Sequence, residues 1–303
     1  MNNFKKKALC AAIGATLVVP SATLMAAEVG NFFHTDGKSN LQIGLFYNDS
    51  KRDVEQKGKA SLFSETDTDT SEGITEDTTL GGSVTNLEGE QQTEDLYLKI
   101  SYALTPKIEV YGKLGASKTD LDVDSASNQF SVTNQYSEDG SVLATVTESV
   151  TESLSELETS GRGSDRGWLA GVGTKITIHQ TDSGWNLGLD GQYNYRNQDI
   201  DKTLAWGGDL ELTDHESHEL QGSLILGKVI GNFRPYGGVS YTKYESEYDL
   251  SVDGDRVGTL DLENEDNIGY FAGFDFDFSG LTASFEARGG DEEAFTIGLR
   301  MPL

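Results

Sequence analysis

The sequence has almost no cysteine. Cys10 is the only one in 303 residues, and it lies within the first 27 residues, which have the features of a secretory signal. A mature chain beginning at Glu28 would therefore contain no disulfide and no thiol chemistry. Cys10 is also a poor candidate for a lipid-anchored cysteine, because too little apolar sequence precedes it.

Basic charge is also scarce. The chain has 23 Lys and Arg residues against 50 Asp and Glu residues, which gives a formal net charge of -27. Removal of Lys5, Lys6 and Lys7 with the signal would leave 20 bases against 50 acids, a charge of -30. Phosphate recognition needs a net basic surface, so we expect no nucleic-acid partner.

Long apolar runs are absent after the signal. Residues 1–27 have the three lysines, the apolar stretch Ala8 to Val19, the breaker Pro20 and the small pair Ala26-Ala27, which together predict export and cleavage before Glu28. No later run is long enough for a membrane-spanning helix. A barrel strand, however, presents only every second residue to lipid, so it leaves no long apolar run.

What the sequence has instead is alternation. In the stretch from Trp185 to Arg196, the residues Trp185, Leu187, Leu189, Tyr193 and Tyr195 share one face, and polar residues fill the other. The pattern returns along the chain, with short and long connections alternating. It predicts one domain, residues 28–303, folded as an all-β, antiparallel, transmembrane up-and-down β-barrel.

We expect about ten strands, with eight or twelve as alternatives. The predicted ranges are 41–47, 96–104, 108–116, 168–178, 185–196, 220–226, 233–241, 268–278, 281–287 and 295–303. Short turns rich in Pro, Gly, Asn, Asp and Ser would face the periplasm, and long acidic loops the exterior. Tyr and Trp recur at both ends of the strands, as at two membrane interfaces. A soluble β-sandwich is the alternative, but it would not sort aromatics in this way.

Thirteen charged residues fall on the inward faces of the predicted strands. They are Lys99, Glu109, Lys113, Lys175, Asp190, Arg196, Glu219, Arg234, Asp275, Asp277, Glu286, Arg288 and Arg300. A ten-stranded barrel has a narrow interior, and opposite charges enclosed there should pair. We interpret the set as an ion-pair plug. A narrow, gated ion pathway is the alternative.

The outer loops are acidic. No Lys or Arg occurs between Ala60 and Gln91, and we expect this first loop to be partly disordered because it lacks a clear turn. Asp139-Gly140, Gly207-Gly208 and Asp253-Gly254 predict hairpin tips, the last joining residues 248–252 to 257–260. Carboxylates here could bind divalent cations. The calcium-loop pattern of residues 253–261 is poor, because Val257 cannot act as a side-chain ligand.

No catalytic constellation is evident. Asp214 and His215 lie near the outer end of a strand, and an acid–histidine pair at the rim of a ten-stranded barrel is found in the omptin proteases. Adjacent strand residues, however, point to opposite faces. We therefore expect no enzyme, no catalytic or metal-binding residue and no cofactor, and keep a rim protease as the weakest alternative.

The segment Arg234-Pro235-Tyr236-Gly237-Gly238-Val239-Ser240-Tyr241 resembles the outer-membrane protein β-barrel domain family. This family includes OmpA- and OmpX-type small barrels and "porin family" proteins. Residues 96–115 and 295–300 add to the likeness. Membership implies insertion by the outer-membrane assembly machinery. That machinery reads a final strand that usually ends in an aromatic, whereas this chain ends Met301-Pro302-Leu303.

Function follows from this location as a set of hypotheses. The first is a non-enzymatic integral protein of the bacterial outer membrane, structural or a narrow, largely closed pore. Its partners would be outer-membrane lipid, lipopolysaccharide and the assembly machinery. The second is a surface adhesion, ligand-binding or cation-binding protein that acts through the acidic loops.

Overall fold

The computed structural model describes residues 40–71, 74–138, 141–155, 159–160, 167–205, 209–252 and 255–303. The expected signal, residues 1–27, lies outside them. So do the three expected hairpin tips, Asp139-Gly140, Gly207-Gly208 and Asp253-Gly254. Within the described ranges, no helix is long and apolar enough to cross a membrane.

The described chain is built from β-strands joined in antiparallel ladders. They are β1 (Leu41–Gln56), β2 (Ala60–Ser71), β3 (Ile74–Thr105), β4 (Ile108–Glu138), β5 (Ser141–Ser155), β6 (Thr159–Ser160), β7 (Gly167–Gln180), β8 (Trp185–Ala205), β9 (Asp209–Lys228), β10 (Phe233–Val252), β11 (Asp255–Asn264), β12 (Ile268–Phe278), β13 (Leu281–Gly289) and β14 (Glu293–Pro302).

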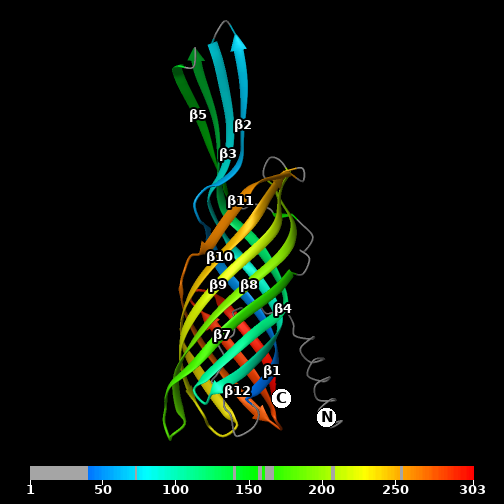
Figure 1. The fold of residues 1–303 in the computed structure, drawn as a ribbon, viewed down its shortest axis with the longest axis vertical. Coiled ribbons are helices and arrows are strands. Elements are labelled where there is room, and N and C mark those ends of the chain that lie inside the picture. The colour runs from blue at the N-terminus through cyan, green and yellow to red at the C-terminus, as the bar shows by residue number, and fades with distance from the viewer. Residues whose placement is uncertain are drawn as a thin grey trace.

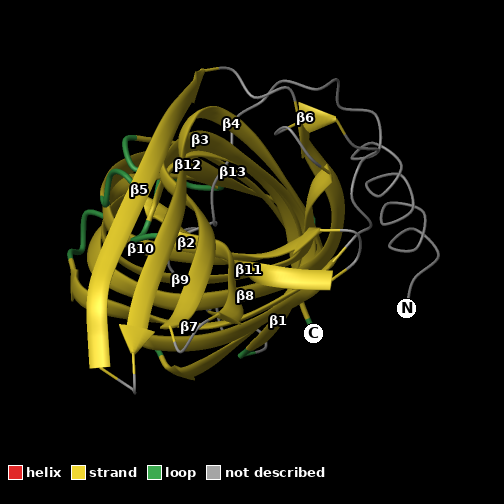
Figure 2. Ribbon diagram, turned by 90° about the horizontal axis from the view of Figure 1, so that it is seen from above, coloured by secondary structure: helices red, strands yellow, loops and turns green. Residues whose placement is uncertain are grey.

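Ten of these strands close into a ring, which confirms the predicted barrel. The ring runs β1-β3-β4-β7-β8-β9-β10-β12-β13-β14 and returns to β1. Closure joins the two ends of the chain, since β1 pairs with β14 from Gln42↔Pro302 to Lys51↔Glu293. Figure 1 shows the tilted strands wrapping the axis, and Figure 2 shows the ring from above. Each predicted strand lies on one of these ten.

Side chains alternate between the two faces of the wall, as the sequence pattern predicts. On β3, Leu96, Leu98 and Ile100 are each about half exposed on the outside. Tyr97 and Lys99, between them, are buried on the inside. The apolar side chains thus form an outer belt around a polar interior. A water-soluble barrel would show the opposite arrangement.

Above this belt, on the side of the long hairpins, the barrel narrows. β7 begins at Gly167, and β12, β13 and β14 stop near the level of Glu293. Beyond them β1 pairs with β11 instead, through only Val54↔Asn264, Glu55↔Glu263 and Gln56↔Leu262. The upper ring among the described residues therefore contains seven strands, β1, β3, β4, β8, β9, β10 and β11.

One side chain takes the place of the missing β7 ladder in the upper ring. The amide of Gln198 on β8 accepts a hydrogen bond from the Thr119 backbone N–H at 2.6 Å. It donates another to the Thr119 carbonyl at 3.0 Å. A side-chain amide carries the same donor and acceptor as a peptide group, so Gln198 joins β8 to β4 where no strand separates them.

Strands β2, β3, β4 and β5 continue past the barrel as a projecting sheet (Figure 1). The expectation of partial disorder in the first loop is therefore wrong for its described residues. β2 and β3 pair from Ala60↔Val84 to Ser71↔Ile74, and Thr68 donates a cross-strand hydrogen bond to Asp77 at 2.7 Å. Threonines alternate with acids along these strands. The β-branched threonines favour an extended strand, and cross-strand pairs stabilise it without an apolar face.

The predicted hairpin of residues 248–252 and 257–260 is confirmed. β10 pairs with β11 from Glu245↔Glu263 to Val252↔Asp255, with a bulge between Leu250 and Ser251. The hairpin prediction for residues 253–261 therefore holds over its described part, residues 255–261.

Candidate functional site: the interior of the barrel

The thirteen charged residues assigned to the lumen from the sequence lie on the inner wall. Twelve are at least nine-tenths buried: Lys99, Glu109, Lys113, Lys175, Asp190, Arg196, Glu219, Arg234, Asp275, Glu286, Arg288 and Arg300. The thirteenth, Asp277, lies at the turn end of β12, where its side chain is 36% exposed. Three groups of contacts fill the interior from the turn end upward.

The first group surrounds Tyr111 on β4. Its hydroxyl donates to both Asp190 oxygens at 2.9 and 3.1 Å. The Lys99 ammonium lies 4.3 Å from the centre of its ring, and Lys113 donates to Gln192 at 2.5 Å. The ring can lie flat against the wall because Gly173 opposite has no Cβ. Cation–π contacts and a shared carboxylate thus hold several ammonium groups in a small volume.

The second group ties the last strands together near the turns. Arg300 and Asp275 form an ion pair at 2.5 Å. Arg234 pairs with Asp277 at 2.6 Å, and the Ser284 hydroxyl donates to Asp275 at 2.7 Å. These bonds join β10, β12, β13 and β14 across the inner wall and satisfy charges that would be costly alone.

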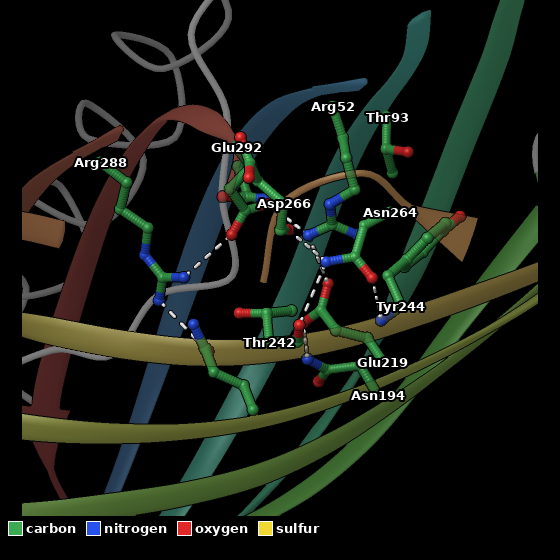
Figure 3. Close-up of polar contacts among 12 residues, drawn as sticks. Arg52, Thr93, Asn194, Glu219, Thr242, Tyr244, Asn264, Asp266, Arg288 and Glu292 are labelled. Atoms are coloured by element: carbon green, nitrogen blue, oxygen red, sulfur yellow. Dashed lines mark hydrogen bonds and ion pairs between the residues drawn. The ribbon is translucent and has the colours of Figure 1, made fainter. Parts of the chain in front are cut away.

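The third group is a chain of ion pairs across the lumen at the level where the ring narrows, and Figure 3 shows its members Arg52, Glu219, Arg288 and Glu292. Asp95 pairs with Arg196 at 2.9 Å, and Arg196 lies 3.7 Å from Glu219. Arg52 bridges Glu219 at 3.4 Å and Glu292 at 2.6 Å. Glu292 also pairs with Arg288 at 3.0 Å, and Arg288 with Glu286 at 3.1 Å. We call this chain of seven residues the central network.

Three members of the central network escaped the sequence analysis. Arg52 and Asp95 occupy positions that alternate inward on their strands. Both lie just beyond the predicted strand limits, residue 47 for Arg52 and residue 96 for Asp95. Extending the alternation by a few residues would have found them. Glu292 gave no signal, because it lies in the connection between β13 and β14 and not in a strand.

The β13–β14 connection is folded into the lumen. Gly290 has φ +103°, a conformation that favours glycine, and a Cβ there would collide with the Ile268 carbonyl. Glu292 is in consequence buried at 3% exposure among arginines. Burial raises the pKa of this carboxyl to about 7, and Arg52 and Arg288 oppose the shift. This tip lies above the apolar belt.

Above the central network the interior becomes apolar. Val54, Leu87, Leu121, Leu212, Tyr248, Leu250, Leu260 and Leu262 are among the buried residues of one hydrophobic cluster inside the seven-stranded ring. A ring with fewer strands has a smaller bore, which side chains can fill. We call this cluster the apolar seal. It reverses the arrangement of the belt below, because apolar residues here face inward.

Asp214 and His215 do not form a catalytic pair. Asp214 is exposed and His215 is fully buried, on opposite faces of β9 as expected. The His215 ring lies 4.6 Å from that of Tyr248, and its Nε2 is 3.0 Å from the Gln91 side-chain nitrogen. Burial lowers the pKa of His215 to about 3, with Arg196 adding to the shift. The imidazole is therefore neutral and enclosed.

No metal site is assembled within the described ranges, where no group of three or more His, Cys, Asp or Glu side chains could hold an ion. The loop acids, although numerous, are distributed along extended strands. Divalent cations at the loops therefore remain a prediction.

No family model and no curated protein matches the chain. Several solved barrels are similar to it at low identity. The beta domain of the Bordetella autotransporter Brka is 12% identical, covering 88% of this chain and 100% of that one, with a TM-score of 0.33. The translocator domain of the autotransporter NalP from Neisseria meningitidis is 10% identical (89% and 90% covered, TM-score 0.31). The Ralstonia pickettii toluene transporter TbuX is 9% identical (88% and 90%, TM-score 0.30). At such scores the likeness carries no argument about function.

Proposed function

We propose that this protein is a non-enzymatic integral protein of the bacterial outer membrane, a structural barrel whose lumen is closed. The observation that carries the proposal is the inversion of polarity along the axis. Half-exposed Leu, Ile, Val and aromatic side chains surround the ten-stranded part, as a bilayer requires. The central network crosses the interior of the barrel, and the apolar seal lies above it, which supports a closed lumen.

The argument for closure is energetic as well as steric. Arg52 and Arg288 are each in contact with two carboxylates at 3.4 Å or less. Separating such pairs without water costs several kcal/mol, on the order of 3–5 for one buried pair. Water entering along the barrel axis would also have to cross the apolar seal. An architecture of the OmpA and OmpX type, a small barrel with a packed interior, fits this proposal better than an open porin.

Conductance across a planar lipid bilayer tests the proposal. The refolded protein should insert without a steady current. A double variant Arg52→Ala/Leu250→Ala should conduct, because it removes one member of the central network and one of the apolar seal. A matched variant on the projecting sheet, Val146→Ala, should remain silent. A steady, porin-sized current from the unaltered protein would refute the closed lumen, and protein that stays in the aqueous phase would refute the membrane location.

A second function is favoured by the projecting sheet. β2 and β5 are its outer strands, and no described strand pairs with their far edges. Val132, Val142 and Val146 are exposed on it. Free strand edges and exposed apolar residues are typical of protein-binding surfaces. We therefore propose surface adhesion as the alternative role. Replacing residues 63–82 and 128–155 by short turns should abolish adhesion to cells while the barrel still inserts, and retained adhesion would dismiss this role.

A further inference from the structure

A cavity of about 390 Å³ opens sideways through the barrel wall where ten strands become seven. The tip of the β13–β14 hairpin borders it on one side, and the connection between β11 and β12 on another. β1 passes along its margin with Lys51 and Asp53. The cavity reaches inward to Arg288 and Glu292 of the central network, and its mouth lies beside Tyr270, a largely exposed aromatic at the outer limit of the belt.

The mouth of the cavity is acidic. Asp53, Glu265, Asp266 and Glu293 line it with exposed carboxylates. The two bases of the lining are already in ion pairs, Lys51 with Glu90 and Arg288 with Glu292. The exposed carboxylates at the mouth therefore attract cations from solution.

Asp291 supplies an independent observation at the floor. Its side chain is only 3% exposed, and neither carboxylate oxygen has a hydrogen-bond partner among the described residues. Burial raises the pKa of Asp291, and the Thr242 hydroxyl and the positive charges of Arg288 and Arg52 oppose the shift. The Ser240 hydroxyl also has no hydrogen-bond partner among the described residues. It and the Asp291 carboxylate both lie close to Gly269, where a Cβ would meet the two groups.

Buried carboxylates in folded proteins are normally paired with a donor or a cation. No three acidic groups here are arranged to hold a metal ion. The floor instead offers the Asp291 carboxylate, and the hydroxyls of Ser240 and Thr242 lie next to Asp291 behind the cavity lining. A primary ammonium group has three N–H donors in a compact volume and matches such a floor.

We propose that this cavity binds a small organic cation with two primary ammonium groups, one at Asp291 and the other among the carboxylates at the mouth. The side opening would admit such a ligand from the outer medium without passage through the apolar seal. The site is independent of whether the lumen conducts.

Calorimetric titration of the full chain, folded in lipid nanodiscs, with 1,4-diaminobutane tests the proposal. Saturable binding at one site per protein is expected. Asp291→Asn should weaken it at least tenfold, and Asp266→Asn, an exposed mouth position that leaves the buried floor intact, severalfold. Asp261→Asn removes the same charge from an exposed position on β11 outside the cavity and should leave the affinity unchanged.

Three results would overturn the proposal. Equal weakening by Asp261→Asn and Asp266→Asn, or titration without saturation, would mean general attraction to an acidic surface. Affinity for butylammonium equal to that for the diamine would remove the second ammonium position. Binding of calcium chloride alone that is lost in Asp291→Asn, with no binding of the diamine, would identify a metal site instead. Each variant is first checked for folding by its heat-dependent electrophoretic mobility.

Discussion

Arg52 is the residue on which the central network most depends, and Arg52→Met is the sharpest test of it. The guanidinium is buried, lies 2.6 Å from Glu292 and 3.4 Å from Glu219, and covers the ring of Tyr244 at 4.3 Å. Methionine keeps much of the volume and removes the charge. Loss of one partner from a buried pair costs about 3–5 kcal/mol, because the other charge is left without compensation.

The cost should fall near the lower end of that range. Glu292 keeps Arg288 at 3.0 Å, and Glu219 keeps Arg196 at 3.7 Å, so neither acid is stranded completely. We therefore expect a loss of about 3 kcal/mol in the free energy of unfolding. Adding Glu292→Gln to Arg52→Met restores the original net charge of the central network. The double variant should lose less unfolding free energy than the summed losses of the two single variants, by about 1 kcal/mol or more. Such a coupling is expected of groups in contact.

Equilibrium unfolding by guanidinium chloride in phospholipid vesicles, followed by tryptophan fluorescence, measures these quantities. Lys57→Met is the matched control, because Lys57 is an exposed base that also contacts two acids, Glu245 at 2.5 Å and Glu263 at 3.6 Å. Its unfolding midpoint should hardly change. If Arg52→Met is as mild as Lys57→Met, or if the two substitutions in the central network are simply additive, the network is not the energetic unit we describe.

Three further predictions concern the hairpin tip, the belt and the apolar seal. Folding raises the pKa of Glu292 from 4.5 to about 7. Between these pH values the folded state keeps a proton that the unfolded state releases. The contribution of Glu292 to the free energy of unfolding therefore falls as pH rises from about 4.5 to about 7. Glu292→Gln should remove this fall, on the order of 3 kcal/mol, from unfolding free energies compared at pH 5 and pH 8; an unchanged pH dependence would contradict it. Leu98→Arg, on the outer face of β3, should cost about 2–4 kcal/mol in vesicles and little in detergent if lipid contacts this position. Leu250→Ala should cost about 2–5 kcal/mol by leaving a cavity in the apolar seal, and a loss under 1 kcal/mol would mean that the upper ring is not packed.

The membrane-level fold is predictable from the sequence because lipid and lumen impose a period of two on each strand. β12 matches its predicted range, 268–278, at both ends, and the inward parity of residues such as Lys99 and Glu286 follows from the same alternation. The alternation does not reveal where a strand ends above the bilayer. β3 extends from Ile74 where the prediction began at residue 96, because threonines and acids continue the strand without an apolar face.

The apolar seal was not predictable for a different reason. Val54, Leu87 and Leu250 occur singly among polar residues, on strands far apart in sequence. They meet only because β7 and β12 to β14 drop out of the ring, which brings β1 against β11 and β8 against β4. That change depends on several strand lengths at once, and no local pattern reports it. The position of Glu292 likewise depends on a glycine turn, at Gly290, that folds a connection inward.

The unequal ladders on the two edges of β1 have a kinetic consequence. Ten residue pairs tie this strand to β14 within the belt, but three tie it to β11 above. Local opening becomes less frequent as more hydrogen bonds must break together. Amide protons near Val54 should therefore exchange with deuterium well before those near Leu45. Brief separation of β1 from β11 would admit water to the apolar seal while the β1–β14 ladder in the belt stays intact.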